Sequence, residues 1–160
     1  MKKNHSRTLN VMFGDFCYFN RQTMYSLYTP LSIGMIAEYS KQQFGNEINV
    51  SLYKSLDKFM KDAEKNPPDV AAFAVYHWNT AITQYATKTL REMFGHNIVI
   101  VLGGPSIDID KKEQERFLSN VFPAADFIIP NEGEIGFYSI LKKIQGNRKD
   151  LFKDPIDGAS

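Results

Sequence analysis

The residues that could bind a ligand or do chemistry fall in three short stretches, each of which directly follows a run of apolar residues. The stretches are Tyr76-His77-Trp78, Gly103-Gly104-Pro105 and Asn131-Glu132-Gly133-Glu134. Two adjacent glycines let the backbone turn sharply and let a flat or bulky group approach the main chain. Free N–H groups where a helix begins hold polar or anionic groups, and carboxylates accept hydrogen bonds from hydroxyls and amides. These residue types predict noncovalent binding of a ligand.

Each stretch also has an interpretation without a ligand. Gly103-Gly104 fits a tight strand-to-helix turn, and Glu134 fits a helix start where a carboxylate complements the helix dipole. His77 is more typical of a hydrogen-bonded histidine than of a metal ligand. Trp78 offers a flat apolar surface beside it. Both interpretations stay open at this point.

The sequence lacks the motifs of several common enzyme classes. Neither the dinucleotide motif G-x-G-x-x-G nor the phosphate loop G-x-x-x-x-G-K-[ST] follows any apolar run. Cys17 lies in a context unrelated to the histidines His5, His77 and His96, so no hydrolytic triad is indicated. A single cysteine also leaves no internal disulfide and no cysteine cluster for zinc or an iron–sulfur centre. We therefore assign neither a catalytic residue nor a metal ligand.

Composition indicates one globular domain. The chain has 160 residues, of which 43% are hydrophobic and 23% charged, and its formal net charge is +1. This charge provides no general field for nucleic acid or acidic membranes, so neither partner is expected. The polar amino terminus leads into an apolar run of about five residues, too short for a signal peptide or a membrane span. With one cysteine, a cytoplasmic location is the default expectation.

Five apolar runs alternate with five helical patterns, and this alternation predicts how the three stretches are positioned. Strands are expected at 9–13, 47–53, 70–76, 98–102 and 126–129, and helices at 30–44, 56–65, 80–94, 111–121 and from within 131–134 to Gly146. Runs such as 70–76 and 98–102 are typical of strands covered on both faces. The pattern predicts an α/β fold: a Rossmann-like, flavodoxin-like, doubly wound five-stranded parallel sheet with helices on both faces. All three stretches then lie at its carboxyl edge, where ligands bind.

Two further features, at the start of the first helix and in the connection before it, are expected near the same carboxyl edge. Thr29 is expected to cap the helix, and Gly34 to allow close approach of a neighbour or a ligand. The connection at 16–28 is long and holds five aromatic residues, namely Phe16, Tyr18, Phe19, Tyr25 and Tyr28. We expect it to fold over a ligand, to cap the sheet or to contact a neighbouring domain.

Three motifs together resemble the cobalamin-binding domain at the amino terminus of many radical S-adenosylmethionine enzymes. They are Tyr28-Thr-Pro-Leu-Ser-Ile-Gly34, Val101-Leu-Gly-Gly-Pro-Ser106, and Pro130-Asn-Glu-Gly-Glu134 followed by Phe137. The similarity spans residues 9–144. In the wider cobalamin-binding family the corresponding order is Asp-x-His-x-x-Gly, Ser-x-Leu and Gly-Gly, and the segments 35–75 and 79–102 keep this spacing closely.

The chain departs from that family in chemistry more than in register. Leu31 stands where the family has its cobalt-ligating histidine, Tyr76 replaces the serine, and Trp78 replaces the leucine. This motif therefore does not imply that a histidine ligates the lower face of the cobalt. Many radical S-adenosylmethionine members of the family also lack that histidine. Asn131 in place of the first glycine is a mild change, because asparagine tolerates left-handed backbone.

The resemblance implies that cobalamin lies above the carboxyl ends of the strands. Its nucleotide tail would pass between Gly34 and the Gly103-Gly104 turn, with 131–134 near ribose or amide groups. The cofactor-binding residues implied are Thr29, Leu31, Gly34, Tyr76, His77, Trp78, Gly103, Gly104, Pro105, Asn131, Glu132, Gly133 and Glu134. His77, Tyr18 or Tyr25 could approach the cobalt, and the sequence does not choose among them.

The resemblance also implies a second domain. The chain lacks the Cys-x-x-x-Cys-x-x-Cys motif that binds the 4Fe-4S cluster and S-adenosylmethionine in the family. We expect residues 1–146 to form the cobalamin-binding domain and 147–160 to lead to a radical S-adenosylmethionine barrel in a methyltransferase or related enzyme. One alternative is a cobalamin-free scaffold or substrate-recognition module, in which Tyr76 and Trp78 fill the tail cleft. A free-standing flavodoxin-like enzyme is the other alternative.

Overall fold

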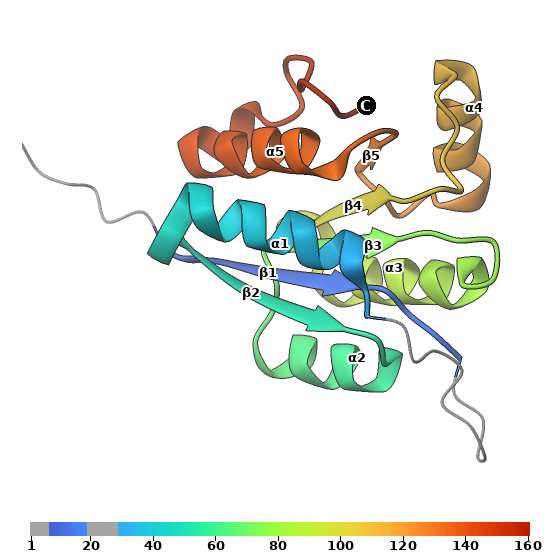
Figure 1. The fold of residues 1–160 in the computed structure, drawn as a ribbon, viewed down its shortest axis with the longest axis horizontal. Helices are drawn as coiled ribbons and strands as arrows, with labels where there is room; N and C mark the ends of the chain where they lie inside the picture. The colour runs from blue at the N-terminus through green and yellow to red at the C-terminus, as the bar shows by residue number, and fades with distance from the viewer. Residues whose placement is uncertain (1–6, 19–28) are drawn as a thin grey trace, which may run out of the picture.

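The computed structural model describes residues 7–18 and 29–160, which form one parallel sheet of five strands (Figure 1). The strands are β1 (Leu9–Gly14), β2 (Ile48–Tyr53), β3 (Val70–Ala74), β4 (Val99–Gly103) and β5 (Phe127–Ile129). Their order is β2-β1-β3-β4-β5, and every pair is parallel. This order belongs to the flavodoxin-like class of doubly wound sheets. The predicted Rossmann-like α/β fold is therefore confirmed.

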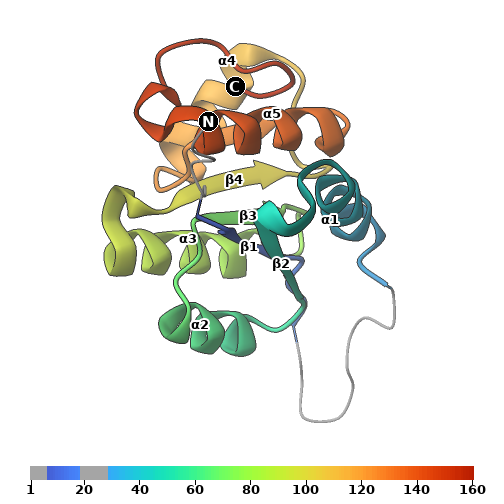
Figure 2. The same ribbon diagram turned by 90° about the vertical axis from the view of Figure 1, so that its left-hand side faces the viewer.

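Helices cover both faces of the sheet (Figure 2). The helices are α1 (Leu31–Phe44), α2 (Leu56–Lys65), α3 (Thr80–Phe94), α4 (Lys111–Arg116) and α5 (Gly133–Asn147), with short turns η1 (Gly45–Glu47), η2 (Gly95–Asn97), η3 (Phe117–Val121) and η4 (Arg148–Asp150). Side chains of α1 and α5 share one buried cluster with one face of the sheet, and those of α2 and α3 share the other. Within the described ranges, no helix combines the length and apolar content that crossing a bilayer requires.

Helix α1 buries one face along its length. Its buried residues are Ile33, Ala37 and Ser40, which follow the helical repeat, whereas Leu31 is 67% exposed. Pro30 occupies the N-cap position without a side-chain cap hydrogen bond, so the prediction that Thr29 caps this helix is wrong.

The start of β5 is held against β4 by a partly buried ion pair. The guanidinium of Arg91 on α3 contacts the Asp126 carboxylate at 2.7 Å, and the same carboxylate accepts the N–H of Ile100 at 2.7 Å. Arg91 also donates to the carbonyl of Ala124 at 2.9 Å. The Asp126 carboxylate is therefore satisfied by charge-assisted hydrogen bonds. Because β5 is so short, this anchoring sets where the following turn, 131–134, meets the carboxyl edge.

Residues 147–160 pack against the domain. Leu151 and Ile156 are buried in the cluster beneath α1 and α5. The main chain of Ser160 exchanges two hydrogen bonds with Ile128 of β5, at 2.7 and 2.8 Å. A Cβ built on Gly136 would lie 2.5 Å from the Gly158 carbonyl oxygen, so the segment lies directly on α5. The proposal that a further domain follows this segment stays a prediction.

We expect Leu151→Ala to lower the free energy of unfolding by about 2–4 kcal/mol, because it empties a fully buried site in the core. The matched control is Ile109→Ala, whose side chain is 73% exposed and which should cost less than about 0.5 kcal/mol. Urea denaturation followed by far-UV circular dichroism measures both. Equal losses would show that the segment is a passive connector.

Candidate functional site

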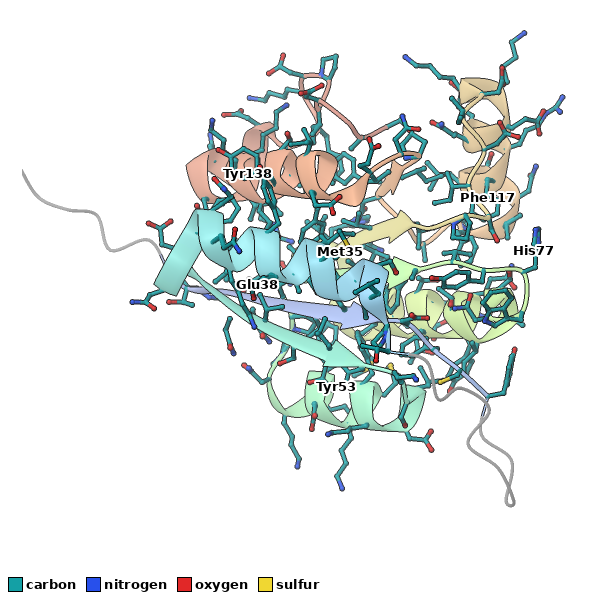
Figure 3. The ribbon with its side chains drawn as sticks, viewed as in Figure 1. Met35, Glu38, Tyr53, His77, Phe117 and Tyr138 are labelled. Carbon is teal, nitrogen blue, oxygen red and sulfur yellow. The ribbon has the colours of Figure 1, made fainter. Side chains whose placement is uncertain are left out.

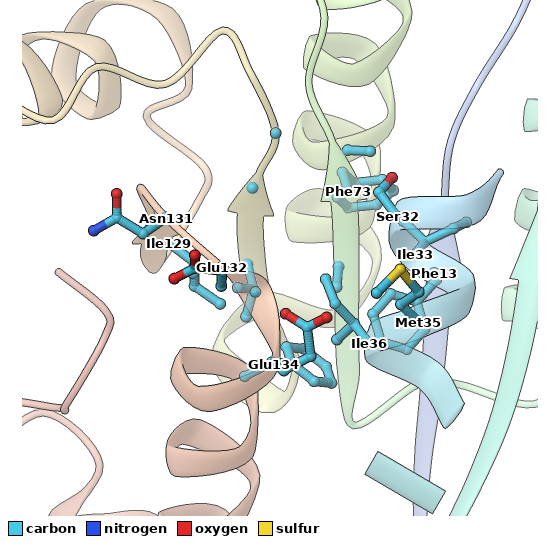
Figure 4. Close-up of a pocket in the computed structure, with 17 residues that line it drawn as sticks. Phe13, Ser32, Ile33, Met35, Ile36, Phe73, Ile129, Asn131, Glu132 and Glu134 are labelled. Atoms are coloured by element: carbon cyan, nitrogen blue, oxygen red, sulfur yellow. The ribbon is translucent and has the colours of Figure 1, made fainter. Parts of the chain in front are cut away.

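A cavity of about 280 Å³ lies at the carboxyl edge of the sheet, between the amino-terminal halves of α1 and α5 (Figure 4). Six of the predicted residues line it: Gly103, Gly104, Asn131, Glu132, Gly133 and Glu134. The other seven do not line it: Thr29, Leu31, Gly34, Tyr76, His77, Trp78 and Pro105. The turn after β4 and the turn after β5 are thus brought together as expected, whereas the site's third side comes from other residues of α1.

The floor of the cavity exists because three floor positions carry small residues. In a strand alternate residues face the same side, so Ala72, Ala74 and Gly103 all point toward α1 and α5. Larger side chains surround them, including Phe13 and Phe137, whose ring centroids lie 4.9 Å apart. Because small residues lie at the centre and larger side chains surround them, a cavity is left between the sheet and the two helices.

The polar groups of the cavity gather at its mouth. They are Ser32 on α1 and Asn131, Glu132 and Glu134 at the start of α5. Glu132 is the N-cap of α5 and makes no side-chain cap hydrogen bond, so the first N–H groups of this helix are available at the mouth. Figure 4 shows the Glu134 carboxylate directed into the space between α5 and α1. The mouth therefore offers both hydrogen-bond donors and acceptors.

The two adjacent glycines have different roles. Of the atoms in the described part of the chain, a Cβ on Gly103 would meet only the Ile129 carbonyl oxygen, at 3.9 Å, so this position opens into the cavity. Gly104 has a φ of +110°, and a Cβ there would lie 2.8 Å from both the nitrogen and the oxygen of Val75. The close approach that Gly104 permits is therefore to the protein's own β3 exit, and only Gly103 gives a ligand room.

Tyr76 and Trp78 lie beside the cavity and leave it open. Their rings stack on each other with centroids 4.5 Å apart and 12° between the planes. The Tyr76 hydroxyl lies 3.4 Å from the Ser32 hydroxyl, across the edge from β3 to α1, and Trp78 is 57% exposed. His77 is exposed, and its side chain points away from the sheet in Figure 3. None of the three fills the space next to Gly103.

Gly34 does not serve close approach of a neighbour. Among residues 7–18 and 29–160, no atom lies within 4 Å of a Cβ built there, so that part of the prediction is wrong. The cavity is instead bounded on α1 by Ser32, Ile33 and Ile36, which lie on the side facing α5. Leu31, at the position of the family's histidine, is an exposed aliphatic side chain and offers no metal ligand.

Asn79 is a positioning residue that the sequence analysis missed. Its side chain is buried, accepts the N–H of Tyr76 at 2.8 Å, and donates to the carbonyls of Ala74 at 2.9 Å and Phe16 at 3.3 Å. These bonds join the ends of β1 and β3 and hold the turn that carries Tyr76 and Trp78. Asn79 is the N-cap residue of α3, but its side chain makes no cap hydrogen bond and is used for these three bonds instead.

The aromatic segment after β1 is described only in part. Phe16 is buried against Phe59 and Phe73, with centroids 5.5 and 5.6 Å away, so it caps the α2–α3 side of the sheet. Tyr18 is about half exposed. The predictions for Phe19, Tyr25 and Tyr28 lie outside the described residues. Across 7–18 and 29–160, no group of three or more His, Cys, Asp or Glu side chains is arranged to hold a metal ion.

No protein-family model and no curated protein matches this chain. The fold and the cavity therefore define its class, a doubly wound α/β domain with a ligand-sized hollow at the carboxyl edge.

We expect Asn79→Leu to lower the free energy of unfolding by about 2–4 kcal/mol, because it leaves the buried N–H of Tyr76 and two carbonyls without their partner. Asn49→Leu, an exposed change on β2, is the control and should have little effect. Guanidinium denaturation compares the two. Similar losses would contradict the assigned role of Asn79.

The two glycines should respond in opposite ways to alanine. We expect Gly104→Ala to cost at least about 2 kcal/mol of stability, because of its positive φ and the contact with Val75. Gly103→Ala should change stability by less than about 1 kcal/mol, since its Cβ enters open space. Differential scanning calorimetry of both variants makes the comparison, and equal melting temperatures would refute it.

Proposed function

We propose that this chain is a corrinoid-binding module that holds the nucleotide tail of cobalamin in the cavity between α1 and α5. The observation that carries the proposal is the open space next to Gly103, at the edge where the sequence motifs expect the tail. The Asn131-Glu132-Gly133-Glu134 turn lines the same space, as the resemblance implies for the tail's polar groups.

The size of the cavity fits part of the cofactor. About 280 Å³ lies just below the range of ligand pockets, which span ~300–1,000 Å³. A flat ring system fits such a space, and a whole corrinoid does not. In the proposed complex the tail enters the cavity, and the macrocycle lies outside, over the carboxyl edge beside the stacked Tyr76 and Trp78.

The residues present suit tail binding better than cobalt ligation. Leu31 is aliphatic, and His77 is exposed outside the cavity lining, so the proposal assigns the cobalt no ligand from this motif. When bound, cobalamin supplies organocobalt chemistry such as methyl transfer. We propose that the radical step belongs to a following domain with a 4Fe-4S cluster and S-adenosylmethionine, in a methyltransferase or related enzyme.

The cobalamin-free alternative loses its main argument. The sequence favours it because Tyr76 and Trp78 are bulky enough to fill the tail cleft, but these rings stack on each other and neither lines the cavity. The aromatic pair instead leaves the cavity mouth accessible from the edge. The corrinoid carrier is therefore the function that the geometry supports best.

The direct test is to mix the pure 160-residue protein with hydroxocobalamin, desalt it, and record the visible spectrum. We expect retention of about one equivalent, together with quenching of the fluorescence of Trp78, the only tryptophan. Corrinoid rings absorb where tryptophan emits, so binding at this edge quenches it. No retained absorbance in the wild-type protein would refute the proposal.

A matched pair of variants tests the position. Gly103→Leu fills the cavity and should weaken hydroxocobalamin binding at least ~10-fold, which corresponds to about 1.4 kcal/mol. The control is Gly146→Leu, at an exposed position of α5 with no atom near its Cβ, which should bind like the wild type. Wild-type affinity in Gly103→Leu would show that the tail does not use this cavity.

A further inference from the structure

We infer that the cavity selects among corrinoids by the base of the nucleotide tail, taking an apolar benzimidazole base and disfavouring a purine such as adenine. This inference rests on the proposed function and adds to it a ligand preference. It follows from how the cavity distributes its polar and apolar groups.

The buried part of the lining consists of carbon side chains. Every cavity-facing side chain of the lining that is at most 5% exposed is apolar: Phe13, Ile33, Ala72, Ala74, Val101, Ile129 and Phe137. The polar side chains of the lining, Ser32, Asn131, Glu132 and Glu134, are all exposed or half-buried. A base that reaches the floor therefore meets no polar side chain there.

The main-chain N–H and C=O groups at the floor are already used in hydrogen bonds between strands. Strand β3 is paired with β1 on one side and β4 on the other, and β4 is paired with β5 beyond it. The last rung, from the N–H of Val75 to the carbonyl of Gly103, is 2.7 Å long. Backbone donors and acceptors in such ladders point along the sheet toward neighbouring strands. They do not face a ring lying on the sheet surface.

The two classes of base respond differently to such a floor. Adenine carries an exocyclic amine and several ring nitrogens that bond to water, and each group buried without a partner weakens binding by about 10-fold. A dimethylbenzimidazole presents methyl groups in their place, whose burial is favourable. We therefore expect the cavity to bind dimethylbenzimidazolyl corrinoid at least ~10-fold more tightly than adeninyl corrinoid.

The test titrates the wild-type protein with three corrinoids and follows Trp78 fluorescence, with equilibrium dialysis as a second readout. The ligands are cobalamin, the same corrinoid carrying adenine as its base, and cobinamide, which lacks the nucleotide. We expect cobalamin to bind most tightly, and the other two to bind at least ~10-fold more weakly.

Two variants on one strand make the test specific to the cavity floor. Val101 and Val99 are both 2% exposed and face the same side of β4, but only Val101 lines the cavity. Val101→Thr places a hydroxyl at the floor and should reduce the preference for cobalamin over the adeninyl corrinoid. Val99→Thr is the control for stability and should keep the wild-type preference. A thermal melt shows that each variant is folded.

The outcomes separate this inference from the proposed function. Equal affinity for cobalamin and the adeninyl corrinoid, both above cobinamide, would overturn the base preference and leave the corrinoid module intact. Equal affinity for cobalamin and cobinamide would overturn the placement of the tail in the cavity. Binding of none of the three would overturn the proposed function itself.

Discussion

The structure of the carboxyl edge depends on the close contact between the main chains of Gly104 and Val75. The N–H of Val75 donates to the Gly103 carbonyl at 2.7 Å, and the N–H of Ser106 donates to the Val75 carbonyl at 3.3 Å. Only a residue without Cβ fits between these bonds, because a Cβ at 104 would lie 2.8 Å from Val75. This contact closes the exits of β3 and β4 together and turns the α-carbon of Gly103 toward the helices.

The cavity persists because the residues on the sheet beneath the contact between α1 and α5 are small. Beyond the cavity, the ring of Tyr138 on α5 packs against Tyr39 and Phe44 on α1, with centroids 6.3 and 5.4 Å away. At the edge, small floor residues such as Ala74 provide no side chain to fill the space. Protein interiors are otherwise close-packed, so an unfilled apolar space at a sheet edge is a feature that a ligand can use.

The sequence predicted part of the site and missed the rest for a geometric reason. Turns after strands β4 and β5 were placed correctly because the carboxyl ends of parallel strands always share one edge. The contribution of α1 was misassigned, since neighbouring helical residues point in very different directions. Ser32 and Ile33 line the cavity, but Leu31 and Gly34 do not. The role of Asn79 includes a hydrogen bond to the Phe16 carbonyl, 63 residues away in the chain, which no local pattern reveals.

The sequence by itself determined the α/β class, the parallel sheet and the edge at which the glycine and glutamate turns meet, because apolar periodicity and chain alternation are local properties. Only the tertiary structure decided that Gly103 faces open space while Gly104 faces Val75, and that Tyr76 and Trp78 pack on each other beside the cavity. It also decided that 147–160 packs on α5, where Leu151 completes the core. The surroundings of these residues depend on packing between helices and strands that are distant in the chain, and local sequence patterns do not encode that packing.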